Sequence, residues 1–216
     1  GIPYPRAARH EPTTLTGPQA RQLIATAGGH RFAPILVVSL GLGVRRGEAL
    51  GLRVQDVDLT AGIVTIARSL RYIAPALRAP DEGPYRLTRT KTGDTRILPL
   101  PAFVADALRD RLAEREREQR AAKVWAANDN VFVDARGNTV PIETLHAWFV
   151  RTVKAAGLPA MRWHDLRSST ATMLIETGTD LETVRRILGH RDIATTLRYV
   201  MRRTATSPSD GPTRRG

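Results

Sequence analysis

Apolar residues recur at helical spacing along most of the chain. A first helix is predicted to begin at Thr16, because Thr16 and Gln19 form a capping-box pattern and Pro18 suits the first turn. Residues 32–42 are apolar nearly all round, which predicts a buried helix. Residues 45–52 predict a short amphipathic helix.

The spacing becomes that of β-strands in the middle of the chain. Short strands are predicted at residues 63–67, 85–90 and 95–98. The last two are expected to form a hairpin through a tight turn at residues 92–94. Three prolines predict a loop over residues 74–84. The fold class predicted is therefore mainly α, with a small antiparallel three-stranded β-sheet.

Helical spacing returns in the second half of the chain. The predicted helices are residues 101–123, residues 142–156 ended by Gly157, a helix carrying His164 to Thr177, a helix from a Thr179–Glu182 capping box to Gly189, and a last helix with Asp192 at its N-cap. Residues 1–14 are predicted to be a linker, residues 15–203 a single domain, and residues 204–216 a disordered tail.

The composition excludes several kinds of site. The chain has no cysteine, so it has no disulfides, thiolate metal sites or cysteine nucleophiles. No apolar run approaches the roughly 18 residues that a membrane span needs. We therefore expect no membrane partner and a location in the cytoplasm or nucleoid.

The net charge of +12 predicts a polyanionic partner, most simply nucleic acid. Acidic and basic residues nearly balance over residues 106–123, where a solvated helix face explains them, so the excess lies elsewhere. Of the 33 basic residues, only Lys91, Lys123 and Lys154 are lysines. Lys91 is either a solvated turn residue or a proton donor, since lysine, unlike arginine, can release a proton near neutral pH.

Tyr199 lies off the apolar stripe of the last predicted helix. At roughly 100° per residue, Ile193, Leu197 and Val200 cluster on one side and Tyr199 points about 120° away. A core tyrosine would lie on the stripe. Tyr199 is therefore either a boundary residue with a half-buried ring or a reactive phenol.

Two pairs of polar residues share a helical face three positions apart. His164 and Arg167 form one pair, and Arg45 and Glu48 form the other. Taken alone, each pair has an ordinary explanation, because His164 could be a core histidine and Arg45 with Glu48 a surface ion pair.

Taken in order, these segments resemble the tyrosine recombinase (phage integrase) family. The resemblance runs from about Glu11 to Val200. The segments that carry it are Gly-Val-Arg-Arg-Gly-Glu-Ala-Leu from Gly43, Thr-Lys-Thr-Gly-Asp-Thr-Arg from Thr90, His-Asp-Leu-Arg from His164, and Leu-Gly-His-Arg-Asp-Ile-Ala-Thr-Thr-Leu-Arg-Tyr from Leu188 to Tyr199.

The resemblance implies a metal-free and cofactor-free active site that cuts and rejoins DNA through a 3′-phosphotyrosine. Tyr199 would be the nucleophile and Lys91 the general acid for the leaving 5′-hydroxyl. The other implied roles are phosphate clamping by Arg45 and Arg167, a further phosphate hydrogen bond from His190, proton movement assisted by His164, and orientation of Arg45 or His164 by Glu48.

The resemblance also implies partners. Double-stranded DNA at attachment or recombination sites is the expected substrate, bound by a homotetramer with a possible accessory DNA-bending or directionality protein. Relatives usually carry an upstream core-binding domain, which this chain is expected to lack. The arginines expected to contact DNA are Arg46, Arg89, Arg96, Arg191 and Arg198.

Other functions remain open from the sequence. A non-catalytic DNA-binding protein of the same fold would need the arginines but not Tyr199, His190 and Lys91 together. A type IB topoisomerase or telomere resolvase would share the chemistry. A serine recombinase using Ser168 or Ser169, or a histidine-based metal hydrolase, lacks the expected surroundings.

Overall fold

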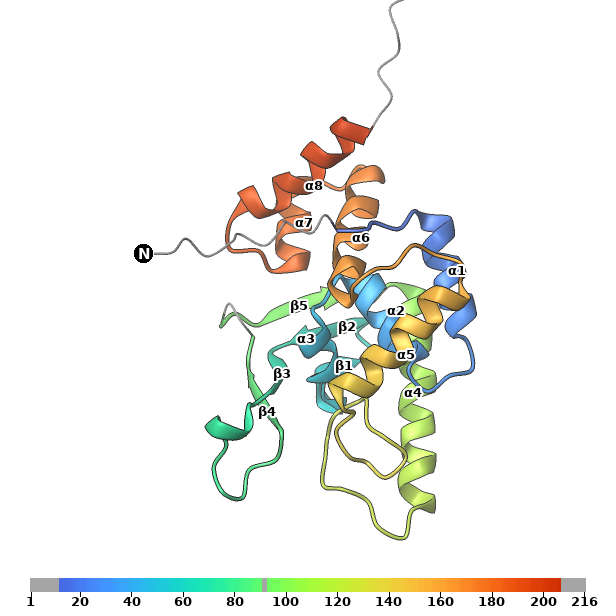
Figure 1. The fold of residues 1–216 in the computed structure, drawn as a ribbon, viewed down its shortest axis with the longest axis vertical. Coiled ribbons are helices and arrows are strands. Elements are labelled where there is room, and N and C mark those ends of the chain that lie inside the picture. Colours follow the sequence, from blue (N-terminus) through green and yellow to red (C-terminus); the bar gives the residue numbers. More distant parts are fainter. Residues whose placement is uncertain (1–11, 91–92, 207–216) are drawn as a thin grey trace, which may run out of the picture.

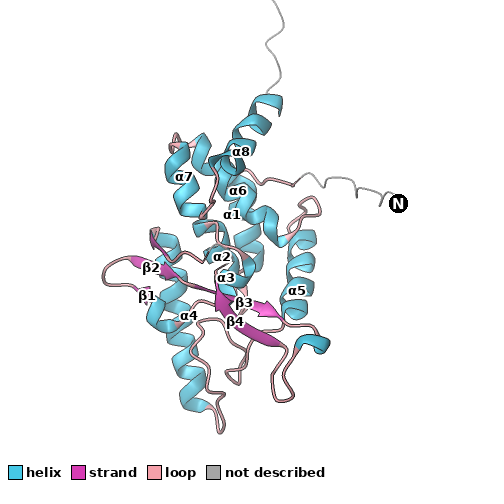
Figure 2. Ribbon diagram, turned by 90° about the vertical axis from the view of Figure 1, so that its left-hand side faces the viewer, coloured by secondary structure: helices cyan, strands magenta, loops and turns pink. Residues whose placement is uncertain are grey.

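The computed structural model describes residues 12–90 and 93–206. It is mainly helical, as predicted (Figures 1 and 2). The α-helices of the described residues are α1 (Gly17–Ala27), α2 (Ala33–Leu42), α3 (Arg46–Leu50), α4 (Ala102–Ala121), α5 (Ile142–Ala155), α6 (Trp163–Glu176), α7 (Leu181–Leu188) and α8 (Ile193–Thr206). Among these, no helix is both long and apolar enough to cross a membrane.

The predicted helix starts are only partly confirmed. Thr16 caps α1 and forms the expected capping box with Gln19. The N-cap of α7 is Asp180, whose side chain accepts from the Thr183 N–H at 2.9 Å, so the Thr179–Glu182 capping box is wrong. Helix α8 continues to Thr206, past the predicted start of the disordered tail.

The strands form two small antiparallel sheets, a three-stranded sheet in the order β1-β2-β5 and a two-stranded ribbon of β3 and β4. The strands β1 and β3 were not predicted. The bounds are β1 (Val57–Asp58), β2 (Ile63–Ile66), β3 (Arg68–Tyr72), β4 (Tyr85–Arg89) and β5 (Arg96–Pro99). The ribbon runs from α3 towards the lower left in Figure 1, away from α4 and α5.

The predicted hairpin between the last two strands is wrong. Strand β4 pairs with β3, and β5 pairs with β2. Because only Ala67 separates β2 from β3, the strands β4 and β5 pair with successive parts of one bent stretch. Between β4 and β5, Thr90 Oγ1 donates to the Asp94 carbonyl at 2.8 Å. Lys91 and Thr92 lie outside the described residues.

Helix α2 lies at the centre of the hydrophobic core. Its side chains are buried on all sides, as its uniformly apolar sequence predicted, and it packs against α1, α3, α4 and α6. A second, smaller cluster joins α6, α7 and α8, which lie together above β5 and α3 in Figure 1. Its buried members are Ala171, Val184, Leu188 and Tyr199.

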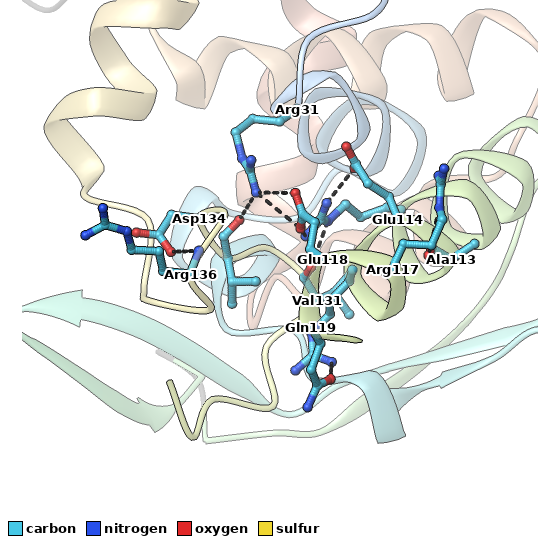
Figure 3. Close-up of polar contacts among 12 residues, drawn as sticks. Arg31, Ala113, Glu114, Arg117, Glu118, Gln119, Val131, Asp134 and Arg136 are labelled. Carbon is cyan, nitrogen blue, oxygen red and sulfur yellow. Dashed lines mark hydrogen bonds and ion pairs between the residues drawn. The ribbon is translucent and has the colours of Figure 1, made fainter. Parts of the chain in front are cut away.

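Helix α4 is not simply a solvated charged helix. Arg111 is 1% exposed and forms ion pairs with Glu114 at 2.5 Å and Glu118 at 3.0 Å. Arg31 also pairs with Glu118, at 3.2 Å, and donates to the Val133 carbonyl at 2.9 Å (Figure 3). This network joins the loop before α2 to α4 and to the segment after it.

Candidate active site

A tight turn between α2 and α3 presents Arg45. Gly43 ends α2 at a φ of +60°, and a Cβ there would lie 2.5 Å from the Leu188 side chain. Both the backbone conformation and the close packing therefore favour glycine. Arg45 is the N-cap of α3, and its backbone N–H donates to Glu48 Oε2 at 2.9 Å.

Glu48 holds two arginines with one buried carboxylate. Arg45 Nη1 donates to Oε1 at 2.8 Å, and Arg96 Nη2 donates to Oε2 at 2.6 Å. Burial alone would raise the pKa of Glu48, but the hydrogen bonds and charges of Arg96 and Arg45 outweigh it and hold the pKa at about 2. Glu48 is therefore ionised at neutral pH. Glu48 was expected to orient Arg45 or His164, and of these two it contacts Arg45.

Arg167 is a buried cation held by neutral groups. It extends from α6, is 1% exposed, and donates to the Gly43 carbonyl at 2.8 Å and to the Leu188 carbonyl. Burial, reinforced by the charge of Arg45, lowers the pKa of Arg167 to about 9, so the group stays charged at neutral pH. No carboxylate of the described residues forms an ion pair with it. Such a site favours an anionic ligand.

His190 contacts Tyr199 and lies within electrostatic range of Arg167. Its Nδ1 is 2.9 Å from Thr196 Oγ1, and its ring stacks on that of Tyr199, with centroids 6.2 Å apart and planes 16° apart. Burial lowers the pKa of His190 to about 3, and the charges of Arg167 and Arg45 act in the same direction. His190 is therefore neutral at physiological pH. The other ring nitrogen, Nε2, can donate to an anion only in the tautomer in which Nδ1 accepts a hydrogen bond from the Thr196 hydroxyl.

Tyr199 is buried, which corrects the expectation for α8. Its side chain is 8% exposed and Thr196 is fully buried, whereas Ile193 and Leu197 are 42% and 38% exposed. The face marked by Ile193 and Leu197 is thus not the one that packs on α6 and α7. Tyr199 also interacts electrostatically with Arg167, so the phenol lies near the buried cation.

His164 stands in the first turn of α6 and lines an open groove of about 830 Å³ together with Arg45. It also interacts electrostatically with His190, so it belongs to the same cluster. The groove runs between the start of α3, the β3 strand and the starts of α5 and α6. Its other polar and basic lining residues are Arg46, Ser69, Arg71, Tyr72, His146 and Arg162.

His190 lines a smaller pocket of about 310 Å³. Its lining residues are Asp94, Arg96, Arg185, Arg186, Gly189, His190 and Arg191. Residues of the cluster therefore line two depressions, Arg45 and His164 the groove and His190 the smaller pocket, and further arginines line both.

The arginines expected to contact DNA differ in exposure. Arg89, Arg191 and Arg198 are exposed, and Arg46 is partly buried in the groove, where burial lowers its pKa. Arg96 instead points inward, with 11% of its side chain exposed and its guanidinium on Glu48.

The sequence motifs are brought together in space. Arg45, Glu48, His164, Arg167, His190 and Tyr199 form one cluster, whereas Lys91 lies outside the described residues. Sequence reasoning missed the inward role of Arg96, the Thr196 partner of His190, and Arg71, His146 and Arg162 in the groove. Within the described residues no group of three or more His, Cys, Asp or Glu side chains could hold a metal ion.

Comparison with known proteins gives consistent matches. The phage integrase family matches residues 13–205. A tyrosine recombinase XerC of Mycobacterium leprae is 31% identical over 208 residues, covering 92% of this chain and 62% of the relative. A tyrosine recombinase XerC-like protein of Caldanaerobacter subterraneus is 29% identical over 194 residues, covering 85% of this chain and 48% of the relative. The chain thus spans about half to three-fifths of these relatives.

Solved structures share the fold. The XerA recombinase crystal structure has a TM-score of 0.68 at 25% identity, covering 93% of this chain and 68% of that one. The Tn1549 transposon integrase, in complex with a circular intermediate DNA, has a TM-score of 0.72 at 22% identity, covering 88% of this chain and 62% of that one. With a family match over nearly its whole described length, the chain belongs to the phage integrase family.

Proposed function

We propose that this chain is the catalytic domain of a site-specific DNA recombinase, which cuts and rejoins DNA strands through a covalent 3′-phosphotyrosine. One observation carries the proposal. The guanidinium of Arg167 is almost fully buried, has no ion-pair partner among the described residues, and lies close to Arg45, His190 and Tyr199. A scissile phosphate would supply the missing negative charge.

In this proposal the phosphate is bound by preorganised donors. Arg45 and Arg167 bind its non-bridging oxygens, and His190 adds a hydrogen bond from the ring nitrogen that faces away from Thr196. Neutral His190 suits this role, because it binds without first losing or gaining a proton. Glu48 keeps Arg45 oriented through the two hydrogen bonds described above.

The reaction is a balanced transesterification. The Tyr199 oxygen attacks phosphorus and loses its proton, with His164 assisting, while the bond from phosphorus to the 5′-oxygen breaks. Lys91 gives its proton to the departing oxygen. A 5′-hydroxyl from another strand reverses these steps, so the energy of the phosphodiester bond is conserved and no ATP is needed.

Double-stranded DNA at attachment or recombination sites is the substrate that fits. The open groove beside Arg45 and His164 is lined by further basic side chains, and the net charge is +12. The solved structures of the Tn1549 integrase and of a lambda integrase dimer are both complexes with DNA. We propose that the chain acts in the nucleoid as a homotetramer on two DNA sites, with accessory proteins setting direction.

A nicked suicide substrate tests the proposal. The nick lets a short 5′-hydroxyl fragment diffuse away after cleavage, so a covalent protein–DNA adduct accumulates and survives denaturing electrophoresis. The wild-type chain should form this adduct, and Tyr199→Phe should bind the same DNA without forming it. A binding protein without catalysis would form no adduct in either case.

A further inference from the structure

Arg96 connects two parts of the site that are far apart in sequence. It begins β5, and its side chain reaches inward between α3 and α7. Nη2 and Nη1 donate to the two carboxylate oxygens of Glu48, at 2.6 and 3.3 Å, while Nε donates to the Ile187 carbonyl at 3.1 Å. All three guanidinium nitrogens therefore have protein partners.

On one side, Arg96 acts on the orientation of Arg45. The Glu48 side chain is fully buried, and its carboxylate accepts from the Arg45 backbone and guanidinium as well as from Arg96. Without Arg96, Glu48 would keep its two hydrogen bonds from Arg45 but lose the partner that ties it to β5. The Arg45 side chain, on the edge of the groove, would then be held less firmly relative to the segment between α7 and α8.

On the other side, Arg96 lies against the segment between α7 and α8. Gly189 has a φ of +63°, and a Cβ there would lie 3.0 Å from Arg96 Nη1, so the guanidinium rests on the glycine backbone. The preceding residue, Leu188, supplies the carbonyl that accepts from Arg167, and the next residue is His190. Through this segment, Arg96 is therefore connected to two of the residues proposed to bind the phosphate, Arg167 and His190.

We propose that Arg96 is a positioning residue. By binding Glu48 and the segment that carries His190 and the Leu188 carbonyl, it fixes the position of Arg45 relative to that segment. This assignment rests on the proposed function and replaces the sequence expectation that Arg96 contacts DNA. The hydrogen-bond donors to the phosphate are then already positioned before DNA binds. Donors that are positioned in advance stabilise the transition state most strongly, because they need not reorganise during the reaction.

The test compares Arg96→Lys and Arg96→Gln with a matched control. Arg68→Lys changes another arginine that begins a strand and donates to a buried carboxylate, that of Asp56, at 2.7 and 2.8 Å. Lysine and glutamine cannot span Glu48 and the Ile187 carbonyl as the guanidinium does. At saturating suicide substrate, both Arg96 variants should form adduct about 100-fold more slowly. Their DNA affinity should stay within about threefold of wild type, and Arg68→Lys should match wild type.

Two results would overturn the assignment. A loss of DNA affinity as large as the loss of rate would make Arg96 a DNA contact, and an unchanged rate would leave it without a role. A double-mutant cycle with Glu48→Gln gives a sharper reading, because effects that pass through Glu48 should be far from additive. Additive effects would contradict the coupling.

A second readout needs no DNA cleavage. The amides of Gly189 and His190 donate to the Arg186 and Arg185 carbonyls, so their hydrogen exchange is measurable by NMR in the free protein. Exchange should be about tenfold faster in both Arg96 variants and unchanged in Arg68→Lys. If the wild-type chain forms no adduct, the proposed function fails, while unchanged exchange in the Arg96 variants would overturn the positioning role separately.

Discussion

The rings of His190 and Tyr199 lie nearly parallel, with centroids 6.2 Å apart, although the two residues are nine positions apart and a helix begins between them. The burial that brings them together also keeps His190 neutral, since it lowers the pKa to about 3. The proposed hydrogen-bond donor and the proposed nucleophile thus lie side by side.

This burial predicts an acid-sensitive stability. The unfolded chain would protonate His190 near its ordinary pKa of 6.5, whereas the folded chain would do so only near 3. The unfolded state therefore binds more protons between these values, and stability falls as the pH drops below about 6.5. In urea unfolding at pH 7.5 and pH 5, His190→Gln should lose less stability than wild type. The exposed-site control His146→Gln should behave like wild type, and equal losses in all three proteins would refute the effect.

Arg45 and Arg167 should each contribute strongly to the rate. Removing a preorganised donor to a developing negative charge costs about 3 kcal/mol, or roughly 10²-fold to 10³-fold in rate. Arg45→Ala and Arg167→Lys should therefore slow adduct formation by this factor, while Arg120→Ala on the surface of α4 should not. EDTA should leave all rates unchanged. Inhibition by EDTA that magnesium or zinc reverses would point to a metal mechanism instead.

Lys91 remains a prediction from the sequence. If it protonates the leaving 5′-oxygen, Lys91→Arg should cleave ordinary DNA slowly, because arginine keeps its proton. Replacing the bridging 5′-oxygen with sulfur should largely restore the rate, since a thiolate leaves without protonation. An equal defect on both substrates would mean that Lys91 only positions DNA, and a normal rate on both would make it a solvated turn residue.

The Arg111 network should matter for stability and not for chemistry. Glu118→Ala removes the carboxylate that pairs with Arg31 and one of the two that pair with buried Arg111, which keeps Glu114, and should cost about 2 kcal/mol of unfolding free energy (Figure 3). The control Glu116→Ala breaks an exposed pair with Arg120 and should cost less than about 1 kcal/mol. Chemical denaturation measures both. A Glu118→Ala variant as stable as Glu116→Ala would contradict the importance of this network.

The sequence predicted local features well. The capping box at Thr16 and the uniformly apolar residues of α2 depend on neighbours within one or two turns, and both are confirmed. The motifs also identified the residues that cluster at the site, because each motif carries its chemistry in a few adjacent positions.

Features that depend on distant partners were not predictable. The pairing of β4 and β5 depends on β2 and β3, and Arg96 meets Glu48 across 48 positions of sequence. A surface arginine and a buried one look alike in sequence. The orientation of α8 was also misread, because the apolar face marked by Ile193 and Leu197 is partly exposed while Tyr199 is buried.

The most direct test of the proposed chemistry is to identify the amino acid joined to DNA. The adduct from the nicked suicide substrate is digested with protease and nuclease, and the remaining nucleotide-bearing peptide is sequenced by mass spectrometry. We predict a nucleotide linked through its 3′-phosphate to Tyr199. Linkage to another residue, such as Ser168, Ser169 or another tyrosine, would contradict the assignment of the nucleophile and with it the mechanism.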